Sequence, residues 1–384
     1  MSEFEPPMRL RGIEKSAIRQ LFDRAKPESI NFGLGEPDLE TPEVIRQAAI
    51  RAITEGRNGY TAHAGLQRLR ELVASDYPQL RATADQVVIT AGSQEALYVA
   101  LMTLVDHGDE VLLPNPGFVA YPTIVRMAGG RPIFYRLPAS GDFAFDVEEF
   151  RRSLSPQTKV VVCVSPSNPT GRMLSDKDLR AMARTLDGTG VYVLSDEIYR
   201  ELCYSKEPAP SISSYYDQTL VIGGLSKSMS MTGWRLGWIF GEQAVIRSAL
   251  VLHGYVTTCA SAISQKAALA AWTARAEEAR AAIRQVFRNR RDHLLTLIKS
   301  ELRLRAVNPD GAFYTMVNIG GYGSSWDVAQ RLLEHGVITV PGSAFGSESE
   351  GFLRVSFCAD LPALEEGVRR MKAGLEGLPR NHMN

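Results

Sequence analysis

The sequence predicts an α/β protein, with a three-layer domain built on a mainly parallel sheet and a smaller α+β domain. Short β-branched runs alternate with helical patterns between roughly residues 46 and 275, an order that parallel βα units produce. The run 159–165 is almost wholly apolar, which is typical of a strand buried on both faces. After a long charged helical run at 274–300, the order of strands and helices changes and indicates the smaller domain.

The larger domain contains six expected core strands. They lie at 87–90, 110–113, 159–165, 191–194, 219–222 and 236–240. Helices are expected at 93–106, at about 118–127, and from the cap Ser175-Asp176-Lys177-Asp178 to about Leu186, because a serine side chain can accept a hydrogen bond from a free N–H of the first turn.

The chain is expected to divide into three parts. Residues 1–45 form an N-terminal segment that packs with the small domain and holds a short helix around Ser16–Asp23. Residues 46–275 form the large domain and residues 276–384 the small C-terminal domain. The last part has expected strands at 312–319, 337–340 and 352–357, and helices at 325–335 and from about Leu364.

The composition limits the classes of partner. The chain of 384 residues has 43 Lys+Arg and 43 Asp+Glu, so the basic surplus typical of a nucleic-acid binder is missing. No apolar run approaches the length of a membrane helix, and the start of the chain does not resemble a signal peptide. Four cysteines cannot form a disulfide framework, and no histidine spacing predicts a metal site. We expect a cytoplasmic protein with no membrane or nucleic-acid partner and no catalytic metal.

The segment from Gly224 to Gly237 carries the strongest functional signal. Lys227 follows an apolar strand directly and has small neighbours, and Arg235 comes eight positions later. A phosphate loop would require Gly at position 226, which is Ser, so that interpretation fails. A surface lysine is the other alternative. The small neighbours leave room for a ligand, however, and α/β folds place their sites at the carboxyl ends of strands.

This segment resembles the attachment-site signature of class I/II aminotransferases, which belong to the fold-type I family of pyridoxal-phosphate (PLP) enzymes. The resemblance implies the PLP-dependent transferase fold type I. It also implies that Lys227 forms a Schiff base with PLP and later shuttles a proton, and that Arg235 clamps the cofactor phosphate. A lysine amine suits this chemistry because its Schiff base can be exchanged for a substrate amine.

Two further motifs are similar to parts of the same family's site. Asp196 ends an apolar strand, where a carboxylate is costly unless paired, although a turn aspartate is an alternative. The run Asp196-Glu197-Ile198-Tyr199 resembles the D-E-x-Y element, which implies that Asp196 pairs with the pyridine nitrogen and Tyr199 contacts the phenolic oxygen. Asn168 lies in an N-P-T-G loop that is also good turn chemistry; the resemblance implies that it contacts that oxygen and the substrate carboxylate.

The phosphate is expected at a helix N-terminus, where free N–H groups and the helix dipole favour an anion. Gly92, Ser93 and Gln94 follow a strand and open a helix, where the family's phosphate loop lies. Phe118 resembles the aromatic residue that stacks on the cofactor ring, with core packing as the alternative.

The substrate carboxylate requires a cation. Arg354 alternates with apolar residues along a strand and resembles the family's substrate arginine, although a solvent-facing arginine is the usual case. Gly35 lies in a G-E-P-D loop whose Gly N–H meets the substrate in the family. Tyr60 resembles the tyrosine that reaches into the partner subunit's site and touches the cofactor phosphate there, which implies a homodimer.

These resemblances imply a ping-pong aminotransferase that acts on an amino acid and a 2-oxo acid. A PLP-dependent carbon–sulfur β-lyase on the same scaffold is the alternative. A transcriptional regulator with an aminotransferase-like domain is a further one, but the resemblance starts by about residue 30, which leaves no expected space for a DNA-binding module.

Two departures from the family pattern accompany the resemblance. Position 224 is Gly where a phosphate-contacting hydroxyl often lies, and Ser226 is a candidate replacement. Members of the family that are specific for dicarboxylic substrates can use an arginine, lent by the other subunit, that lies after the Lys227–Arg235 segment. The corresponding stretch 253–260 contains no arginine, which puts an aspartate-specific assignment in doubt. The donor and acceptor stay open, since we expect them to depend on side chains near Ile13, Ser16, Tyr121 and 255–261.

Overall fold

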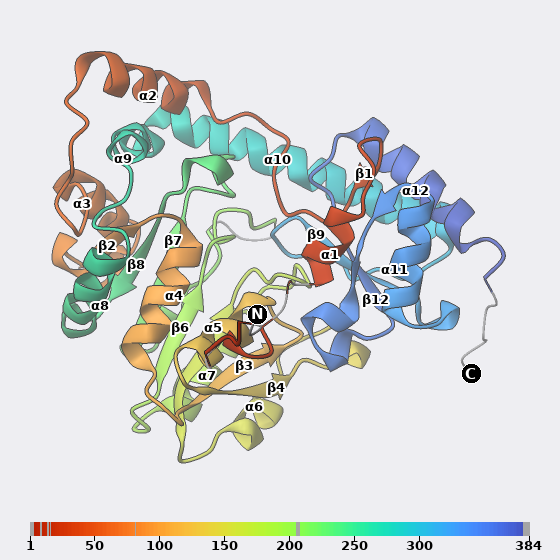
Figure 1. Cartoon of the computed structure of the whole chain (residues 1–384), viewed down its shortest axis with the longest axis horizontal. Coiled ribbons are helices and arrows are strands. Elements are labelled where there is room, and N and C mark those ends of the chain that lie inside the picture. Colours follow the sequence, from red (N-terminus) through yellow and green to blue (C-terminus); the bar gives the residue numbers. More distant parts are fainter. Residues whose placement is uncertain are drawn as a thin grey trace.

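A seven-stranded sheet forms the centre of the larger part of the molecule (Figure 1). The computed structural model describes residues 4–7, 10–13, 15, 17–80, 82–204 and 208–378. The strands are β2 Val87–Thr90, β3 Glu110–Asn115, β4 Arg131–Arg136, β5 Thr158–Val164, β6 Tyr192–Asp196, β7 Thr219–Gly224 and β8 Gly237–Gly241. Their order is β2-β8-β7-β6-β5-β3-β4, and only β8 runs antiparallel to its neighbours. The predicted mainly parallel sheet is confirmed.

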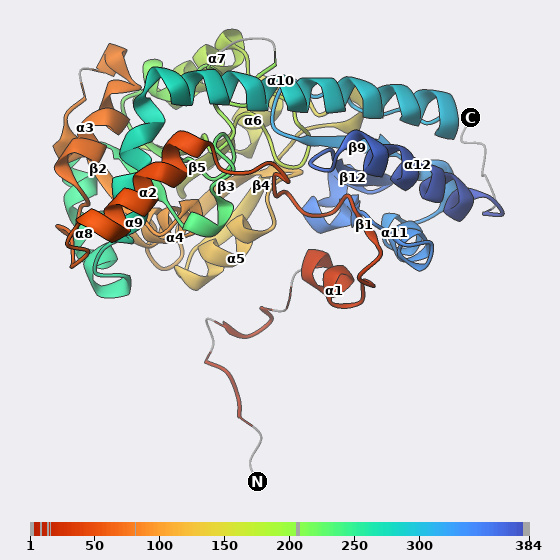
Figure 2. The ribbon, with the colours of Figure 1, turned by 90° about the horizontal axis from the view of Figure 1, so that it is seen from above.

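Helices cover both faces of this sheet, as Figure 2 shows. Successive side chains of a strand point to opposite faces. Accordingly, Val160 and Val162 of β5 pack in the cluster that includes α4 Ser93–Leu104, α5 Ala120–Met127 and α8 Gln243–Val256. Val161 and Cys163 pack in the cluster that includes α6 Val147–Ser153 and α7 Asp176–Leu186. Burial on both faces explains the continuous apolar run in the sequence.

The strand β4 was not predicted. It lies at the edge of the sheet, its register includes Pro132, and Phe134 is 43% exposed. An edge strand lacks the continuous apolar pattern of a central one, so its sequence gave no clear signal. The helix cap predicted at Ser175 is confirmed, because its side chain accepts a hydrogen bond from the Asp178 N–H.

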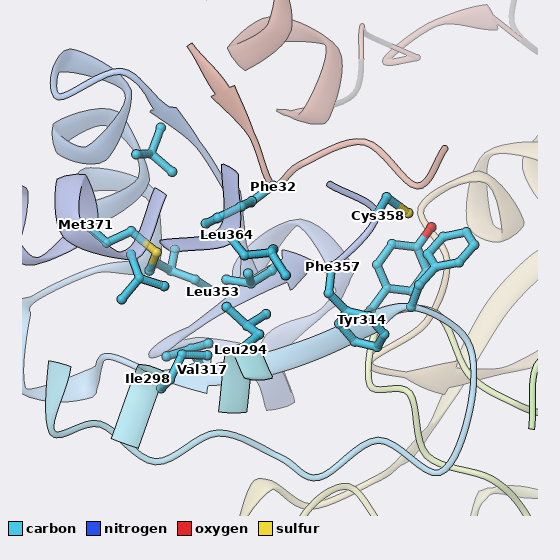
Figure 3. Close-up of a cluster of buried hydrophobic side chains, with 14 of the residues drawn as sticks. Phe32, Leu294, Ile298, Tyr314, Val317, Leu353, Phe357, Cys358, Leu364 and Met371 are labelled. Carbon is cyan, nitrogen blue, oxygen red and sulfur yellow. The ribbon is translucent and has the colours of Figure 1, made fainter. Parts of the chain in front are cut away.

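The C-terminal part contains a three-stranded antiparallel sheet of order β11-β12-β9. Its elements are β9 Tyr314–Asn318, α11 Ser325–Glu334, β11 Val340–Pro341, β12 Phe352–Ser356 and α12 Leu361–Leu375. Figure 3 shows its core, a cluster to which Phe32, Leu353, Leu364 and Met371 all belong. The N-terminal segment therefore contributes to this core.

Two predicted boundaries in this part were wrong. The strand expected at 337–340 is divided: β10 Val337–Ile338 pairs with β1 Ile30–Asn31 in a separate sheet, and β11 pairs with β12. The last helix starts at Leu361 instead of Leu364, because the Asp360 side chain accepts a hydrogen bond from the Ala363 N–H and a proline occupies the first turn.

The remaining helices lie outside these two sheets. They are α1 Ala17–Asp23, α2 Glu43–Glu55, α3 Gln67–Ser75, α9 Ala262–Ala268 and α10 Ala274–Leu297, with a π-helix at Ile298–Leu302. The 3₁₀ helices are Pro78–Leu80, Ala84–Gln86, Ala139–Gly141, Ile212–Ser214, Thr232–Trp234, Leu269–Trp272, Gly320–Tyr322, Gly342–Phe345 and Ser347–Ser349.

The long helix α10 crosses from the large sheet to the C-terminal part (Figure 1). Its Ala276 belongs to a core of the large sheet, and its Phe287 and Leu294 belong to the C-terminal core. Within the described residues, the structure has no helix that is both long and apolar enough to cross a membrane.

Candidate active site

A cavity of about 490 Å³ lies at the carboxyl edge of the parallel strands. Asp196 ends β6, and Asn168 and Lys227 lie in the loops that follow β5 and β7. The cavity brings together most of the residues predicted from the sequence, namely Gly35, Ser93, Gln94, Phe118, Asn168, Asp196, Tyr199, Lys227, Arg235 and Arg354. Parallel strands end at one edge of a sheet, so residues far apart in the sequence meet there.

Asp196 lies deeply buried at the floor of this cavity. Burial raises the pKa of its carboxyl group, and hydrogen bonds from the Tyr121 hydroxyl and the Ile198 N–H oppose that rise, as does the charge of Lys227. The Tyr121 hydroxyl donates to Oδ2 at 2.8 Å, and the Ile198 N–H donates to Oδ1 at 3.3 Å. A carboxylate in this setting favours a cationic partner.

Lys227 is half-buried with its ammonium group turned into the cavity, where Nζ donates a 2.8 Å hydrogen bond to the Gly35 carbonyl. Burial lowers the pKa of its amine, and the charges of Arg235 and Arg354 lower it further. A lysine with a lowered pKa is a better nucleophile and base at neutral pH.

The start of α4 forms one end of the cavity together with Arg235. Gly92 has a φ of 87°, and a Cβ there would lie 2.5 Å from Arg235 Nη2. A Cβ at Gly237 would lie 2.6 Å from the Ser93 nitrogen. Glycines at both positions therefore let the guanidinium and β8 approach the free N–H groups of the first turn, an arrangement that suits an anion.

Arg354 lies on β12 in a buried position at the other end. Its Nη1 donates a 2.8 Å hydrogen bond to Asn168 Oδ1, and its Nη2 donates to the Gly33 carbonyl. Its buried Nε has no hydrogen-bond partner within the described part of the chain. Because an unpartnered buried donor is costly, this arginine is suited to receive an acceptor from a bound ligand.

Tyr314 is a cavity residue that the sequence did not predict. Its hydroxyl lies 3.0 Å from the Tyr199 hydroxyl, and its ring stacks 4.3 Å below the Arg354 guanidinium. A Cβ at Gly35 would lie 1.6 Å from the Tyr314 hydroxyl oxygen, so a glycine is required there. The partial signal was the strand expected at 312–319, which by itself does not show that Tyr314 faces a cavity.

Other expected residues lie outside the cavity. Tyr60 is 90% exposed, and Gly92 adjoins the cavity without lining it. Ile13 and the described stretch 255–261 do not line it either, Tyr121 instead contacts Asp196 below it, and Ser16 lies outside the described residues. Residues that do line it and were not predicted include Ile18, Arg19, Phe22, Leu34 and Val119. Ser226 lines it as well, beside the hydroxyl-free Gly224.

Residues 27–371 match the sequence profile of the family described as aminotransferase class I and II. The chain belongs to this family. It is 39% identical to the probable N-acetyl-LL-diaminopimelate aminotransferase of Bacillus subtilis (strain 168), over 94% of this chain and 93% of that one. It is 34% identical to the probable aspartate aminotransferase of Methanocaldococcus jannaschii, over 95% and 98% of the two chains. The aspartate aminotransferase of Thermus thermophilus, solved with maleate, superposes with a TM-score of 0.92 at 32% identity, over 97% of this chain and 100% of that one.

The protein is thus a PLP-dependent aminotransferase of fold type I, as the sequence predicted. The cavity fits the cofactor in its charges. Arg235 and the first turn of α4 suit a phosphate, and the buried carboxylate of Asp196 suits a protonated ring nitrogen. Lys227 lies in the same cavity with an amine whose pKa is lowered.

Proposed function

We propose that this aminotransferase binds PLP and its amino-acid substrate in the cavity around Lys227, with the residue roles that the sequence predicts. The observation that carries the proposal is the convergence of Lys227, Asp196 and Arg354 on one cavity from three different loops and strands. PLP supplies an electron sink for the carbanion that forms at the substrate Cα.

Different residues of the cavity are assigned to the phosphate and to the ring of the cofactor. Arg235 and Gly92, Ser93 and Gln94 hold the phosphate. Asp196 would accept a hydrogen bond from the protonated ring nitrogen, and Tyr199 and Asn168 would donate to the phenolic oxygen. Phe118, which meets Tyr121 edge-on at 5.5 Å, lies against the ring.

The substrate contacts come from Arg354, Asn168 and the N–H of Gly35. The unpartnered Nε of Arg354, described above, supports a bound α-carboxylate. With the substrate oriented in this way, the Lys227 amine would serve as the general base for the Cα proton and then as the general acid that delivers it. The lowered pKa of Lys227 favours the neutral amine that this step requires.

Acidic side chains are the substrate class that the cavity favours. Three arginines line it: Arg235 serves the phosphate, Arg354 the α-carboxylate, and Arg19 lies on α1 at the wall, where it also pairs with Asp23 at 3.9 Å. We assign Arg19 to an anionic group of the substrate side chain. The names of two relatives, one a probable aspartate aminotransferase and the other an aspartate aminotransferase, support this assignment.

The proposed assembly is a homodimer in which Tyr60 reaches the partner's site. Exposed apolar side chains support a buried interface: Tyr60, Ile50, Ile53, Val251 and Tyr255 are all at least half exposed. Large exposed apolar groups commonly mark such contacts.

We also propose that the chain divides at 45 and 275, and that it works in the cytoplasm. The pairing of β1 with β10 and the separate hydrophobic clusters of the two parts support this division of the chain. Cys163, Cys203, Cys259 and Cys358 form no disulfide with one another, which is consistent with a reducing compartment.

An amino-acid panel tests the function directly. The PLP-loaded enzyme is mixed with single amino acids without any 2-oxo acid, and its visible spectrum is recorded. We expect conversion to the aminated cofactor with acidic amino acids and no released ammonia. Release of pyruvate and ammonia from cystathionine would instead indicate the β-lyase.

A further inference from the structure

A buried polar cluster lies behind the first turn of α4, outside the cavity. Glu95 Oε2 accepts a 2.5 Å hydrogen bond from the Ala91 N–H. Glu95 Oε1 accepts from the Thr257 hydroxyl at 2.6 Å and contacts His253 Nδ1 at 2.8 Å. His253 is fully buried and the Glu95 side chain is 9% exposed. The cluster thus joins α4 to the end of α8.

The protonation states of this cluster follow from its hydrogen bonds. Burial raises the pKa of Glu95, but hydrogen bonds from His253, Thr257 and Ala91 outweigh that effect and lower it overall. Glu95 is therefore an ionised acceptor, and His253 Nδ1 must carry a proton to donate to it. All three neighbours donate to one carboxylate.

The residue that Glu95 holds is next to the proposed phosphate site. Ala91 directly precedes Gly92, the N-cap of α4 with its φ of 87°. The Ala91 carbonyl also accepts a 3.4 Å hydrogen bond from Arg235 Nη2. Ala91 is thus fixed at its N–H by Glu95 and at its carbonyl by Arg235. This holds the backbone that leads into the first turn of α4, where the Ser93 and Gln94 N–H groups lie.

The charge of Glu95 is unfavourable for an anion at the same helix end, because like charges repel through a poorly screened interior. The position of Glu95 is explained if its carboxylate is needed to hold Ala91. The hydrogen bonds from His253 and Thr257 stabilise the negative charge on Oε1 and so reduce its repulsion of an anion at the helix end.

We propose that Glu95 and His253 are positioning residues for the cofactor phosphate, which act by fixing the Ala91–Ser93 turn. This inference rests on the proposed role of that turn and of Arg235. Neither residue lines the cavity, so the effect is transmitted through the backbone. The end of α8, 158 residues further along the chain, is thereby linked to cofactor retention.

The decisive variant is Glu95→Gln. Its amide has one acceptor oxygen in place of two and carries no charge, so it cannot accept from the Ala91 N–H and from His253 and Thr257 together. We expect the apoenzyme to bind PLP about tenfold more weakly, the usual effect of losing a hydrogen bond to a charged group. Binding of pyridoxal, which lacks the phosphate, is expected to stay unchanged. Both constants can be measured by equilibrium dialysis.

Two His253 variants separate positioning from packing. Asn places an amide N–H near the position of Nδ1, so His253→Asn is expected to bind PLP as tightly as the wild type. His253→Leu has no such donor and is expected to bind PLP as weakly as Glu95→Gln. His293→Asn is the matched control, because His293 contacts Glu365 at 3.0 Å on the surface. If Glu95→Gln does not fold, Thr257→Val removes one donor and takes its place.

The results distinguish the inference from the function on which it rests. Arg235→Gln is measured in parallel and must lose affinity for PLP but not for pyridoxal. If it does so while the Glu95 and His253→Leu variants weaken neither ligand, or weaken both equally, the inference is wrong. If Arg235→Gln shows no phosphate-selective loss, the assigned phosphate site is wrong and the inference fails with it.

Discussion

The Tyr121 hydroxyl, on α5, donates a 2.8 Å hydrogen bond to the carboxylate of Asp196 at the end of β6. Both side chains are buried, at 1% and 5% exposure. Tyr121 therefore belongs to the support of the proposed ring-nitrogen partner and not to the wall of the cavity. Its hydrogen bond favours the ionised form of Asp196 against the effect of burial.

Replacing Asp196 by Asn tests that carboxylate. We expect the affinity for PLP to fall about tenfold to hundredfold, because a charge-assisted hydrogen bond is lost. The pKa of Asp196 is raised above its ordinary 3.8, so above pH 3.8 the folded apoenzyme binds more protons than the unfolded chain and loses stability as the pH rises.

Asp196→Asn removes this loss. The melting temperature of the apo variant should therefore depend less on pH than that of the wild type above about pH 4, and at pH 7 it should be at least as high. Calorimetry of the two apoenzymes across this range measures the effect. A variant that is less stable than the wild type at every pH would contradict the assignment of an electrostatic cost to Asp196.

Replacing Lys227 by Ala separates cofactor binding from proton transfer. The variant is expected to retain PLP through the phosphate and ring contacts, but to lose about 10²–10⁴-fold in turnover because its general base is missing. Stopped-flow spectra with an amino-acid substrate measure the first half-reaction. Lys159→Ala, an exposed lysine of β5, is the control, and near-normal turnover of Lys227→Ala would refute the scheme.

Gly35→Ala tests the packing of the substrate loop against Tyr314. The new Cβ would overlap the Tyr314 hydroxyl at 1.6 Å, so the loop or the tyrosine must move. We expect kcat/KM to fall at least about tenfold, since small displacements in a site are costly. Gly141→Ala is the control because no atom lies within 4 Å of its Cβ position, and equal activities of the two variants would contradict the expectation.

Mixed dimers test the proposed partner role of Tyr60. A Tyr60→Ala subunit keeps its own Lys227, and a Lys227→Ala subunit keeps the tyrosine that would reach its partner. Unfolding and refolding equal amounts of the two together should restore one complete site per mixed dimer. Because half of the randomly paired dimers are mixed, the mixture should reach up to about a quarter of the wild-type activity. Light scattering is expected to give twice 42.2 kDa. A mixture no more active than the better homodimer would show that Tyr60 does not act across the interface.

Arg19→Gln tests the proposed substrate class. We expect kcat/KM for aspartate and glutamate to fall about tenfold, the usual cost of losing a hydrogen bond to a charged group, with little change for alanine. Arg126→Gln, an exposed arginine in the last turn of α5, is the control. Equal losses for acidic and neutral amino acids would show that Arg19 supports the fold and does not bind the substrate side chain.

Much of the cavity was predictable because its residues follow local patterns. Asp196, Asn168 and Lys227 come at or just after the ends of apolar strands, and Ser93 begins a helix directly after a strand. Because parallel strands end at one edge of a sheet, these local patterns are enough to predict that the four residues lie at that edge. The edge strand β4 and the division of 337–340 between two sheets were not predictable, because exposure and pairing partners are not encoded in a short apolar run.

By itself, the sequence determined the elements that carry the site, and with the family resemblance it determined the cofactor. The contacts between side chains were decided only by the tertiary structure. Tyr199 meets Tyr314 across 115 residues, and Glu95 meets His253 across 158. Local conformation depends on residues within a few positions of each other, whereas these pairs form only when the sheet, α8 and β9 have packed together. The same packing made Gly35 obligatory and left one donor of Arg354 for a ligand.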